Sequence, residues 1–505
     1  MDCPPSPIIS PPPCSTNIIV LSSAGKPIFS RYPLANNGSL VTISGLVQAI
    51  LSFATSLETN IKTILTTNET YLFLQRGSVF LLAISPSPSI STNYLALLLE
   101  YAYSQILFTL TSKIQKIFQK SAGFDLTNLF GEDSHSVLCS LLDTAESSGS
   151  LLLQGVTILP LPPPVRKEAS RVLLAGGKMI ENTLFSLLLD KKGRLISLVM
   201  PAQIENQLQP SDAHLISNFF ASQPGLLASE SWLPVCLPRF NETGFVYAYS
   251  AGLDKESDVV LVMVSVVSSI EQFHLFQNVK SAIASALHFD LAAKSAAGTA
   301  CALHESVIQA NSTIQNTLVA RYCSIASALH FLYRVEVPIK GGGKLTQTLS
   351  PQVGFPFVDD RSRADVWKSY QDLAVMLRGS KDYTENDSDD DAGNGDDYDY
   401  DSSDDAGDNN RNGNGNGKGN EQKNEKDIFE AKCQSFMAKP VKKRNVAFFS
   451  GAGGEIFCGL NGAGFEIYAV MPSNLGGTEA VQNLVRLTRK LREDADFLFF
   501  SPATW

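Results

Sequence analysis

The side chains that most often carry out catalysis or bind metals lack the spacing that such chemistry needs. None of the histidines at 135, 214, 274, 288, 304 and 330 belongs to an H-x-x-x-H or H-x-E pattern, so no ligand set of a zinc hydrolase is visible. The eight cysteines include no C-x-x-C pair, which argues against a zinc ribbon, a redox motif or a disulfide framework. We therefore expect no metal site and mostly structural thiols.

Two glycine-rich segments could cradle a phosphate but depart from the patterns that do so. Gly341-Gly342-Gly343-Lys344 would need Gly at Pro338 and Ser or Thr at Leu345 to form a phosphate-binding loop. Gly451-Ala452-Gly453-Gly454 leads into another strand-like run, whereas a pyrophosphate site needs a helix N-terminus. No G-x-S-x-G motif is present. We expect turns at both segments, no cofactor and no covalent catalytic residue.

Basic side chains cluster at two places near the end of the sequence. Near-surface cations of this kind can bind anionic lipid, each contributing on the order of 1 kcal/mol. The alternative is an ordinary solvated outer face, as any surface helix shows. The candidates for lipid contact are Lys442, Lys443, Arg444, Arg486, Arg489, Lys490 and Arg492.

The net charge of -10 comes mainly from one segment. Asp382 to Asp408 holds 13 of the 50 acidic residues and no Lys or Arg, so the rest of the sequence is nearly balanced. Such a balance gives no general attraction to nucleic acid. The segment lacks aliphatic residues, which predicts a disordered insertion at 381–438, and its Asp spacing does not match a calcium-binding loop.

The apolar runs repeat one order three times: two strands, a helix, three strands and a helix. The first copy comprises Asn17–Ser22, Ile28–Tyr32, helix Ile43–Leu57, Ile61–Leu65, Tyr71–Leu74, Val79–Ile84 and helix Asn93–Phe118. The second comprises Thr183–Leu189, Leu195–Val199, helix Asp212–Ala221, Trp232–Leu237, Phe245–Tyr249, Val259–Val267 and helix Ile270–Leu287. The third comprises Phe331–Val337, Leu345–Leu349, helix Ala364–Leu377, Val446–Ser450, Ile456–Leu460, Phe465–Met471 and helix Thr478–Arg492.

Tight turns between successive runs imply antiparallel neighbours, and fully apolar strands need helices over the sheet. The sequence thus predicts an α+β fold of three longin-type (Roadblock-related) domains, each a five-stranded antiparallel sheet flanked by helices. We place a Pro-rich disordered N-terminus at 1–15, the domains at 16–150, 151–290 and 321–505, and a linker or helical extension at 291–320. Apolar runs are too short to span a bilayer, and no secretory signal is recognisable, so we expect a cytoplasmic protein.

The helix Ile43–Leu57 lacks charge along its whole length, which suggests contact with another protein. A surface helix normally carries charged residues on its outer face, whereas the polar positions here are filled by uncharged side chains such as Gln48. Together with the preceding hairpin, this helix supplies our candidates for a partner-binding or GTPase-binding surface. They are Lys26, Arg31, Leu46, Gln48, Ile50, Phe53 and Leu57.

Several strings resemble the vacuolar fusion protein family Mon-one, in the same order along the sequence. They are Ser23 to Tyr32, Leu159-Pro160-Leu161 with Val165-Arg166, Trp232 to Asn241 with Gly244-Phe245, His330 to Tyr333, and Gly464 to Tyr468 through Leu484 to Trp505. The resemblance touches all three predicted domains. Its departures are the roughly 16 residues before the first strand, where many family members carry a long region, and the acidic insertion.

The resemblance implies a subunit of a heteromeric exchange factor. In that family a Mon-one and a Ccz-one subunit pair through their first longin domains, jointly bind the late-endosomal Rab-seven GTPase and promote its nucleotide exchange. Rab-five and phosphatidylinositol 3-phosphate membranes are further candidate partners, with peripheral recruitment to endosome or vacuole membranes. The alternative is a non-catalytic longin-domain scaffold or adaptor, closer to the related Fuzzy or Hermansky-Pudlak subunits.

Overall fold

The computed structural model describes most of the chain outside the acidic segment. The described residues are 15–32, 37–56, 61–86, 90–112, 127–223, 225, 229–253, 259–287, 302–311, 315–353, 356–379, 445–451 and 453–505. The predicted disordered N-terminus, apart from Ser15, and the predicted insertion at 381–438 lie outside them, as do Leu57, Lys442, Lys443 and Arg444. Among the described residues, no helix is long and apolar enough to cross a membrane.

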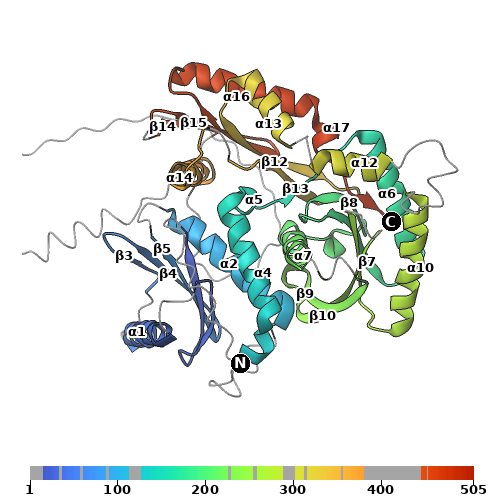
Figure 1. Ribbon diagram of the computed structural model, residues 1–505, viewed down its shortest axis with the longest axis horizontal. Coiled ribbons are helices and arrows are strands. Elements are labelled where there is room, and N and C mark those ends of the chain that lie inside the picture. Colours follow the sequence, from blue (N-terminus) through green and yellow to red (C-terminus); the bar gives the residue numbers. More distant parts are fainter. Residues whose placement is uncertain are drawn as a thin grey trace, which may run out of the picture.

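The first unit is a five-stranded antiparallel sheet between two helices (blue in Figure 1). Its order is β2-β1-β5-β4-β3, so the chain forms a hairpin, crosses the sheet and returns to pair in the middle. Helix α1 packs one face through Val47, and α2 packs the other. The elements are β1 (Asn17–Ser22), β2 (Pro27–Ser30), α1 (Asn37–Ser56), β3 (Thr63–Leu65), β4 (Thr70–Arg76), β5 (Val79–Ser85) and α2 (Thr92–Leu110).

The second unit repeats this order as β8-β7-β11-β10-β9 (green in Figure 1). Every residue of β11 is buried, because helices cover both faces of the sheet. Helices α6 and α10 pack one face, and α7 packs the other. The elements are α6 (Pro163–Lys178), β7 (Thr183–Asp190), β8 (Leu195–Met200), η1 (Ile204–Asn206), α7 (Pro210–Ser222), β9 (Ser231–Leu237), α9 (Pro238–Asn241), β10 (Glu242–Gly252), β11 (Val259–Ser265), α10 (Ile270–Ala286) and α12 (Ala302–Gln309).

The third unit has the strand order β13-β12-β16-β15-β14 (yellow to red in Figure 1). Helix α14 packs one face of the sheet, and α13 and α16 pack the other. The elements are α13 (Gln315–Ala326), β12 (His330–Pro338), β13 (Lys344–Leu349), α14 (Asp360–Arg378), β14 (Val446–Ser450), β15 (Ile456–Gly462), β16 (Phe465–Met471), α16 (Gly477–Glu493) and α17 (Ala495–Leu498).

Two short parallel strands join the second and third units. β6 (Val156–Thr157) follows the first unit and pairs with β13 of the third sheet. β17 (Ala503–Thr504) follows the third unit and pairs with β8 of the second. Each of these sheets therefore has six strands instead of the predicted five. The extra strands have only two residues each, too few to show an alternating pattern in the sequence.

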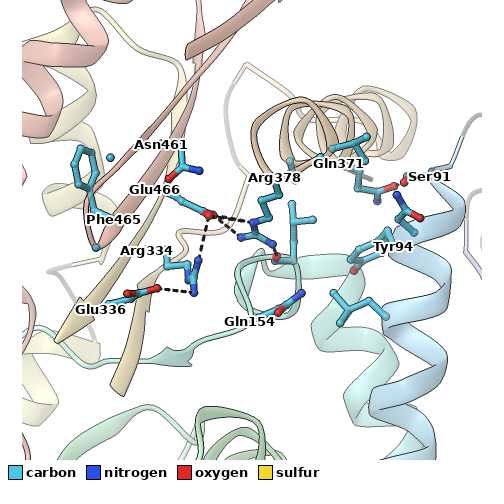
Figure 2. Close-up of a pocket in the computed structure, with 18 of the residues that line it drawn as sticks. Ser91, Tyr94, Gln154, Arg334, Glu336, Gln371, Arg378, Asn461, Phe465 and Glu466 are labelled. Carbon is cyan, nitrogen blue, oxygen red and sulfur yellow. Dashed lines mark hydrogen bonds and ion pairs between the residues drawn. The ribbon is translucent and has the colours of Figure 1, made fainter. Parts of the chain in front are cut away.

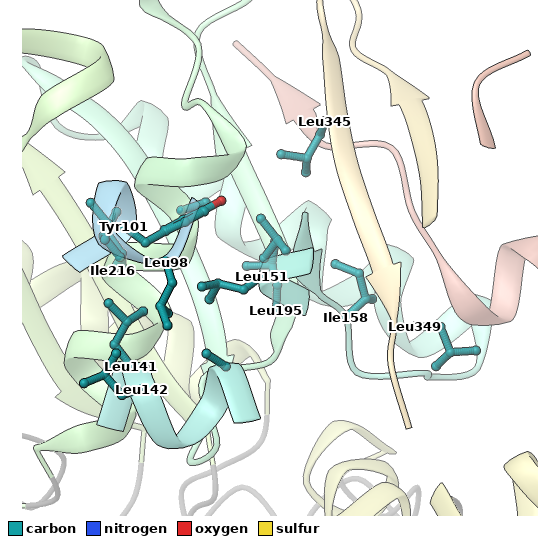
Figure 3. Close-up of a cluster of buried hydrophobic side chains, with 14 of the residues drawn as sticks. Leu98, Tyr101, Leu141, Leu142, Leu151, Ile158, Leu195, Ile216, Leu345 and Leu349 are labelled. Atoms are coloured by element: carbon teal, nitrogen blue, oxygen red, sulfur yellow. The ribbon is translucent and has the colours of Figure 1, made fainter. Parts of the chain in front are cut away.

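One hydrophobic core runs through all three units. Helix α2 contacts the first sheet and also β9 of the second, while α4 (Thr127–Ser147) lies against both α2 and α7. Helix α5 (Ser150–Leu153) connects this layer to β13. Figure 3 shows Leu98, Leu141, Leu195 and Leu345 from these different elements in one buried cluster.

The structure confirms the antiparallel α+β fold, and each predicted strand has a counterpart in it. Helices α4 and α6 and the short helices α5, α9 and α17 were not predicted from the sequence, and α13 continues beyond the predicted extension at 291–320. Helix α2 ends at Leu110, and residues 113–126, which include the rest of the predicted helix, are not described. Within the predicted linker, α12 and α13 are helical, which fits the helical-extension alternative over those residues.

Candidate partner-binding surface

The outward face of α1 carries no charged side chain among its described residues; it combines apolar residues with the hydroxyl side chains of Thr42, Ser52 and Ser56. Val41, Leu46 and Phe53 are 63%, 60% and 65% exposed, respectively. Gly45 and Ala49, also exposed, lie between them on the same face. Helix faces of this composition are normally covered by another protein, because exposed apolar residues on soluble chains are usually scattered singly.

The inner face of α1 is held by the sheet and by the β1–β2 turn. Val47 is buried against Ile19 and Leu21 of β1. Gln48 donates from Nε2 to the backbone oxygen of Ser23 at 3.0 Å. Gly25, in the same turn, has φ of +76°, and a Cβ there would lie 3.3 Å from Cβ of Gln48. The turn therefore requires glycine, both for its left-handed backbone and for the approach of α1.

The structure brings some of the predicted surface residues together and separates one. Leu46 and Phe53 lie on the outer face, whereas Ile50 is half-buried beside them. Gln48 joins the helix to the hairpin that carries the half-buried Lys26. Arg31 is 7% exposed, so little of it can reach a partner on this surface.

Arg31 instead forms ion pairs that connect α4 to the first sheet. Its guanidinium donates to Asp143 at 2.6 Å, to Glu146 at 2.6 and 2.8 Å, and to the backbone oxygen of Thr16 at 2.9 Å. Burial alone would lower the pKa of Arg31, but the carboxylates of Glu146 and Asp143 outweigh it and raise the pKa above its usual value. The side chain is a fixed internal cation.

Strand β3 forms the edge of the first sheet opposite β2. It pairs with β4, and no second neighbour occurs for it within the described residues. Leu65 at its end is 52% exposed. An edge strand presents unpaired backbone N–H and C=O groups that can bind another chain. The first unit thus offers an apolar helix face and an open sheet edge.

The basic candidates on α16 differ in how available their charges are. Arg486, Arg489 and Arg492 are exposed, and Arg486 donates to Oδ1 of Asn483 at 3.2 Å. Lys490 is paired with Glu493 at 3.1 Å and Asp494 at 3.2 Å. The Arg492 guanidinium lies 4.2 Å from the ring centroid of Phe465, close enough for a cation–π contact. Among the described members of the set, Arg486 and Arg489 therefore offer the most accessible positive charge.

A cavity of about 500 Å³ between α2, α14 and the third sheet holds the densest charge network (Figure 2). Glu466 of β16 is 5% exposed and accepts from Arg334 at 3.1 Å and from Arg378 at 2.5 and 2.9 Å. Burial would raise the pKa of Glu466, but Arg378 and Arg334 outweigh it, so this pKa lies below its usual value. Arg378 also donates to the Leu152 oxygen at 2.8 Å and thereby binds α5 to the third unit.

This network joins β12, β16 and α14 of the third unit to α5. Arg334 and Arg378 share Glu466, and Arg334 also pairs with Glu336 at 3.2 Å, so the two arginines face two carboxylates. Across the part of the chain that the structure describes, no group of three or more potential metal ligands gathers. Sequence reasoning missed the network, although Glu466 between apolar neighbours in a predicted strand was a signal of a buried, paired charge.

The fold and its surface define a class of protein: small antiparallel sheets with helices on both faces and an uncharged helix facing outward, as in longin-domain platforms. Family models match two of the three units as longin domains. The model described as the first longin domain of FUZ, MON1 and HPS1 matches residues 16–138, and that of the second longin domain matches residues 181–285. The first two units are therefore longin domains.

The chain is similar to curated proteins named vacuolar fusion protein MON1. It is 30% identical to mouse homolog B and 31% identical to human homolog B, in each case over 72% of this chain and 64% of the relative. It is 33% identical to the Arabidopsis thaliana homolog over 49% of this chain and 39% of that protein. The chain thus spans just under two thirds of the first two relatives, and the resemblance to the Mon-one family is confirmed.

Proposed function

We propose that the chain is a subunit of a heteromeric guanine nucleotide exchange factor for the late-endosomal Rab-seven GTPase. Its partner would be a Ccz-one-like subunit that pairs with the first longin domain. The complex would act in endosome maturation and vacuole or lysosome fusion. The observation that carries the proposal is the uncharged outer face of α1 with Val41, Leu46 and Phe53 exposed. The names of the relatives, which refer to vacuolar fusion, support the proposed role in vacuole or lysosome fusion.

Exchange of this kind needs no covalent catalyst. The factor binds the nucleotide-free GTPase better than the loaded form, so release of nucleotide accelerates. By linkage, incoming GTP then ejects the factor. A 1000-fold acceleration requires about 4 kcal/mol of differential binding at the transition state. An apolar interface that displaces a switch loop of the GTPase can supply this amount.

We expect two partners to share the surface of the first unit. The open edge of β3 and the α1 face are the two features that suit the pairing subunit, because backbone pairing fixes orientation and apolar side chains give affinity. The GTPase would contact the remainder of the α1 face and the hairpin near Lys26, which Gln48 holds against the helix. This chain alone provides half of the platform and should be inactive.

The test is release of a fluorescent GDP analogue from Rab-seven, with the chain co-purified with its Ccz-one-like partner and with the chain alone. We expect acceleration by the pair only. Leu46→Asp and Phe53→Asp should abolish pairing or reduce exchange at least tenfold while leaving the fold intact, because both side chains point to solvent. Ile270→Asp is the matched control, since Ile270 is 68% exposed on a helix of the second unit.

Two outcomes would contradict the proposal in different ways. Robust exchange by the single chain would show that the platform is not shared. A stable pair without exchange activity on any late-endosomal Rab would favour the scaffold or adaptor function instead. Equal losses for Ile270→Asp and Leu46→Asp would remove the α1 face as the specific surface.

We also infer that the third unit is a longin domain, with boundaries near 321–505. Its strand order repeats that of the other two units, and His330–Tyr333 in β12 belongs to the resembling strings. We further propose that α16 of this unit contacts anionic endosomal lipid through Arg486 and Arg489 and recruits the cytoplasmic complex peripherally. Phosphatidylinositol 3-phosphate and Rab-five are candidate recruiting partners.

A further inference from the structure

Apolar side chains are exposed on both sides of the line where β14 meets α16 in the third unit. Val446 and Phe448 of β14 are 40% and 56% exposed, and Val485 of α16 is 43% exposed. Successive strand residues point to opposite faces of a sheet, so Val446 and Phe448 share one face. Ala447 and Phe449 point to the other face and pack in the cluster that includes α14.

The ring of Phe448 lies against the start of α16. A Cβ on Gly477, the first residue of this helix, would lie 2.8 Å from the ring, so glycine leaves the space that the ring occupies. Val481 and Val485 follow Gly477 at intervals of four residues and therefore lie on the same side of the helix. We call the row of Val446, Phe448, Val481 and Val485 the β14–α16 strip.

On α16 this row continues into arginines. Arg489 and Arg492 follow Val485 by four and seven residues, which places them on the same side of the helix, and both are exposed. β14 contains no charged residue. Of the acidic residues of α16, Glu479 lies on the opposite side of the helix from the strip, and Glu493 is paired with a lysine of the same helix. The strip is thus apolar along its length and cationic at one end.

This combination of side chains fits an anionic lipid surface. Apolar side chains that lie beside cations can enter the boundary between headgroups and acyl chains, while the cations stay among the headgroup phosphates. A protein interface, in contrast, is depleted of charged residues at its core. The sequence adds further positive charge at this strand, because Lys442, Lys443 and Arg444 directly precede β14, outside the described residues.

The position of the strip leaves the partner-binding surface free. Figure 1 shows α16 and β14 at the top of the molecule and α1 at the bottom. A membrane that contacts the third unit through the strip therefore does not cover the exposed face of α1. The two surfaces can be occupied at the same time.

We propose that the β14–α16 strip inserts into the headgroup region of anionic membranes. Phe448 is the deepest side chain, and Arg489 and Arg492 contact headgroup phosphates. The proposal rests on the proposed contact of α16 with anionic lipid and adds an apolar anchor from a separate strand. Charge brings the chain to the membrane, and burial of the strip holds it there.

The test places a fluorescent reporter in the strip. Phe448→Trp in the full chain adds one tryptophan to the three already present, at a position exposed enough to accept the larger ring. On phosphatidylcholine liposomes that contain phosphatidylserine, the added emission should shift to shorter wavelength, and lipids brominated on their acyl chains should quench it. The unaltered chain gives the baseline. Liposomes of phosphatidylcholine alone should cause neither change.

The outcomes separate this proposal from the arginine contact on which it rests. Sedimentation with the anionic liposomes without quenching would overturn the insertion and leave the arginine contact in place. Quenching that survives Arg486→Glu with Arg489→Glu would support the insertion and remove the arginine contact. Failure of the chain to sediment with anionic liposomes would overturn both.

Matched substitutions test the strip without a reporter. Phe448→Ser should weaken liposome binding about tenfold, and Val485→Ser should weaken it less, because each loses apolar area that the membrane buries. Val358→Ser is the control for Val485→Ser: Val358 is 68% exposed and lies directly before α14, on the opposite face of the third sheet. Circular dichroism should show that all three variants are folded.

Two results of these substitutions would contradict the proposal. Equal losses for Val358→Ser and Val485→Ser would show that the strip has no special part in binding. Unchanged liposome binding by Phe448→Ser and Val485→Ser, together with loss of the Ccz-one-like partner in co-purification, would make the strip a protein interface, against the lipid surface proposed here.

Discussion

At the scale of single residues, the surroundings of a charged side chain determine its role. Arg31 and Arg489 have the same chemistry, yet Arg31 is buried between two carboxylates and Arg489 is exposed. The sequence indicated both as candidates for binding a partner or lipid, because spacing does not reveal where a carboxylate from a distant helix will lie. Asp143 and Glu146 belong to α4, a helix that the sequence did not predict.

Glu466 should matter far more to stability than its neighbour Glu336. Glu466→Gln leaves Arg334 and Arg378 without their shared carboxylate. We expect a loss of about 3 kcal/mol in unfolding free energy, the lower end for breaking a buried pair, because both arginine side chains are 20% exposed. Urea unfolding would show it as a lower midpoint with unchanged slope.

The matched control for this change is Glu336→Gln. The Glu336 side chain is 28% exposed and is 3.2 Å from Arg334 and from Lys344, so its loss should cost less than about 1 kcal/mol. Similar midpoints for the two variants would show that Glu466 is not the centre of the network.

Histidine 214 should make the fold sensitive to mild acid. Burial lowers its pKa to about 4, below the usual value of about 6.5. The unfolded chain therefore binds a proton at higher pH than the folded chain does, so stability is lost as pH falls from about 6.5 to 4, by up to about 1.4 kcal/mol per pH unit. His330, with a pKa also lowered by burial to about 4, adds in the same direction.

His214→Phe should reduce this acid sensitivity without disturbing the packing. The imidazole ring of His214 makes an edge-to-face contact with the ring of Tyr101, with the two ring centroids 5.4 Å apart. Its Nε2 has no hydrogen-bond partner among the described residues, so an apolar ring fits. Thermal unfolding at pH 7 and pH 5 should show a smaller difference than in the unaltered chain. The exposed His274 provides the control: His274→Phe should leave the difference unchanged, and the same outcome for His214→Phe would refute the argument.

At the scale of elements, periodicity revealed the strands and the more apolar helices. Strands such as β11 have continuous apolar runs because they are buried on both faces. The unpredicted helices give weaker signals: α4 is interrupted by Gly131 with φ of +52°, and α6 contains the Gly176–Gly177 pair, where Ile283 and Trp505 approach. Packing by other elements stabilises both helices, and packing between distant segments is not visible in a local pattern.

Helix α16 should bind anionic membranes mainly through two of its four cations. Arg486→Glu with Arg489→Glu should weaken binding to liposomes containing phosphatidylinositol 3-phosphate and phosphatidylserine, since both charges are exposed. Binding of the unaltered chain to these liposomes should fall steeply with added salt. Sedimentation with liposomes at two salt concentrations measures both effects.

Lys490 supplies the internal comparison for the same helix. Its ammonium group already pairs with Glu493 and Asp494, so Lys490→Glu should reduce liposome binding less than either arginine reversal. If the arginine reversals leave sedimentation unchanged, α16 is a solvated face and does not recruit the protein.

At the scale of the whole molecule, the three units form one body because elements cross between them. The second half of the third unit carries β14, β15, β16, α16 and β17, and each has a partner earlier in the chain or within the same half. β16 pairs with β12, α14 packs on β15, and β17 pairs with β8. Of these contacts only the β17–β8 pairing joins two units, and the order of elements in the sequence could not predict it, since it joins residues far apart in the chain.

Residues 1–379 and 445–505, produced as two separate chains in one cell, should therefore assemble into one complex. Insertion of β16 beside β12 completes the third sheet, and the burial of Leu484, Leu487 and Leu491 by α16 drives association. Size-exclusion chromatography should show a one-to-one complex. Gly459→Leu in the shorter chain is the control, because a Cβ at this position already lies 2.7 Å from Leu377 of α14, and it should prevent assembly. Separate elution of the unaltered fragments would mean that the third sheet cannot form without the covalent connection.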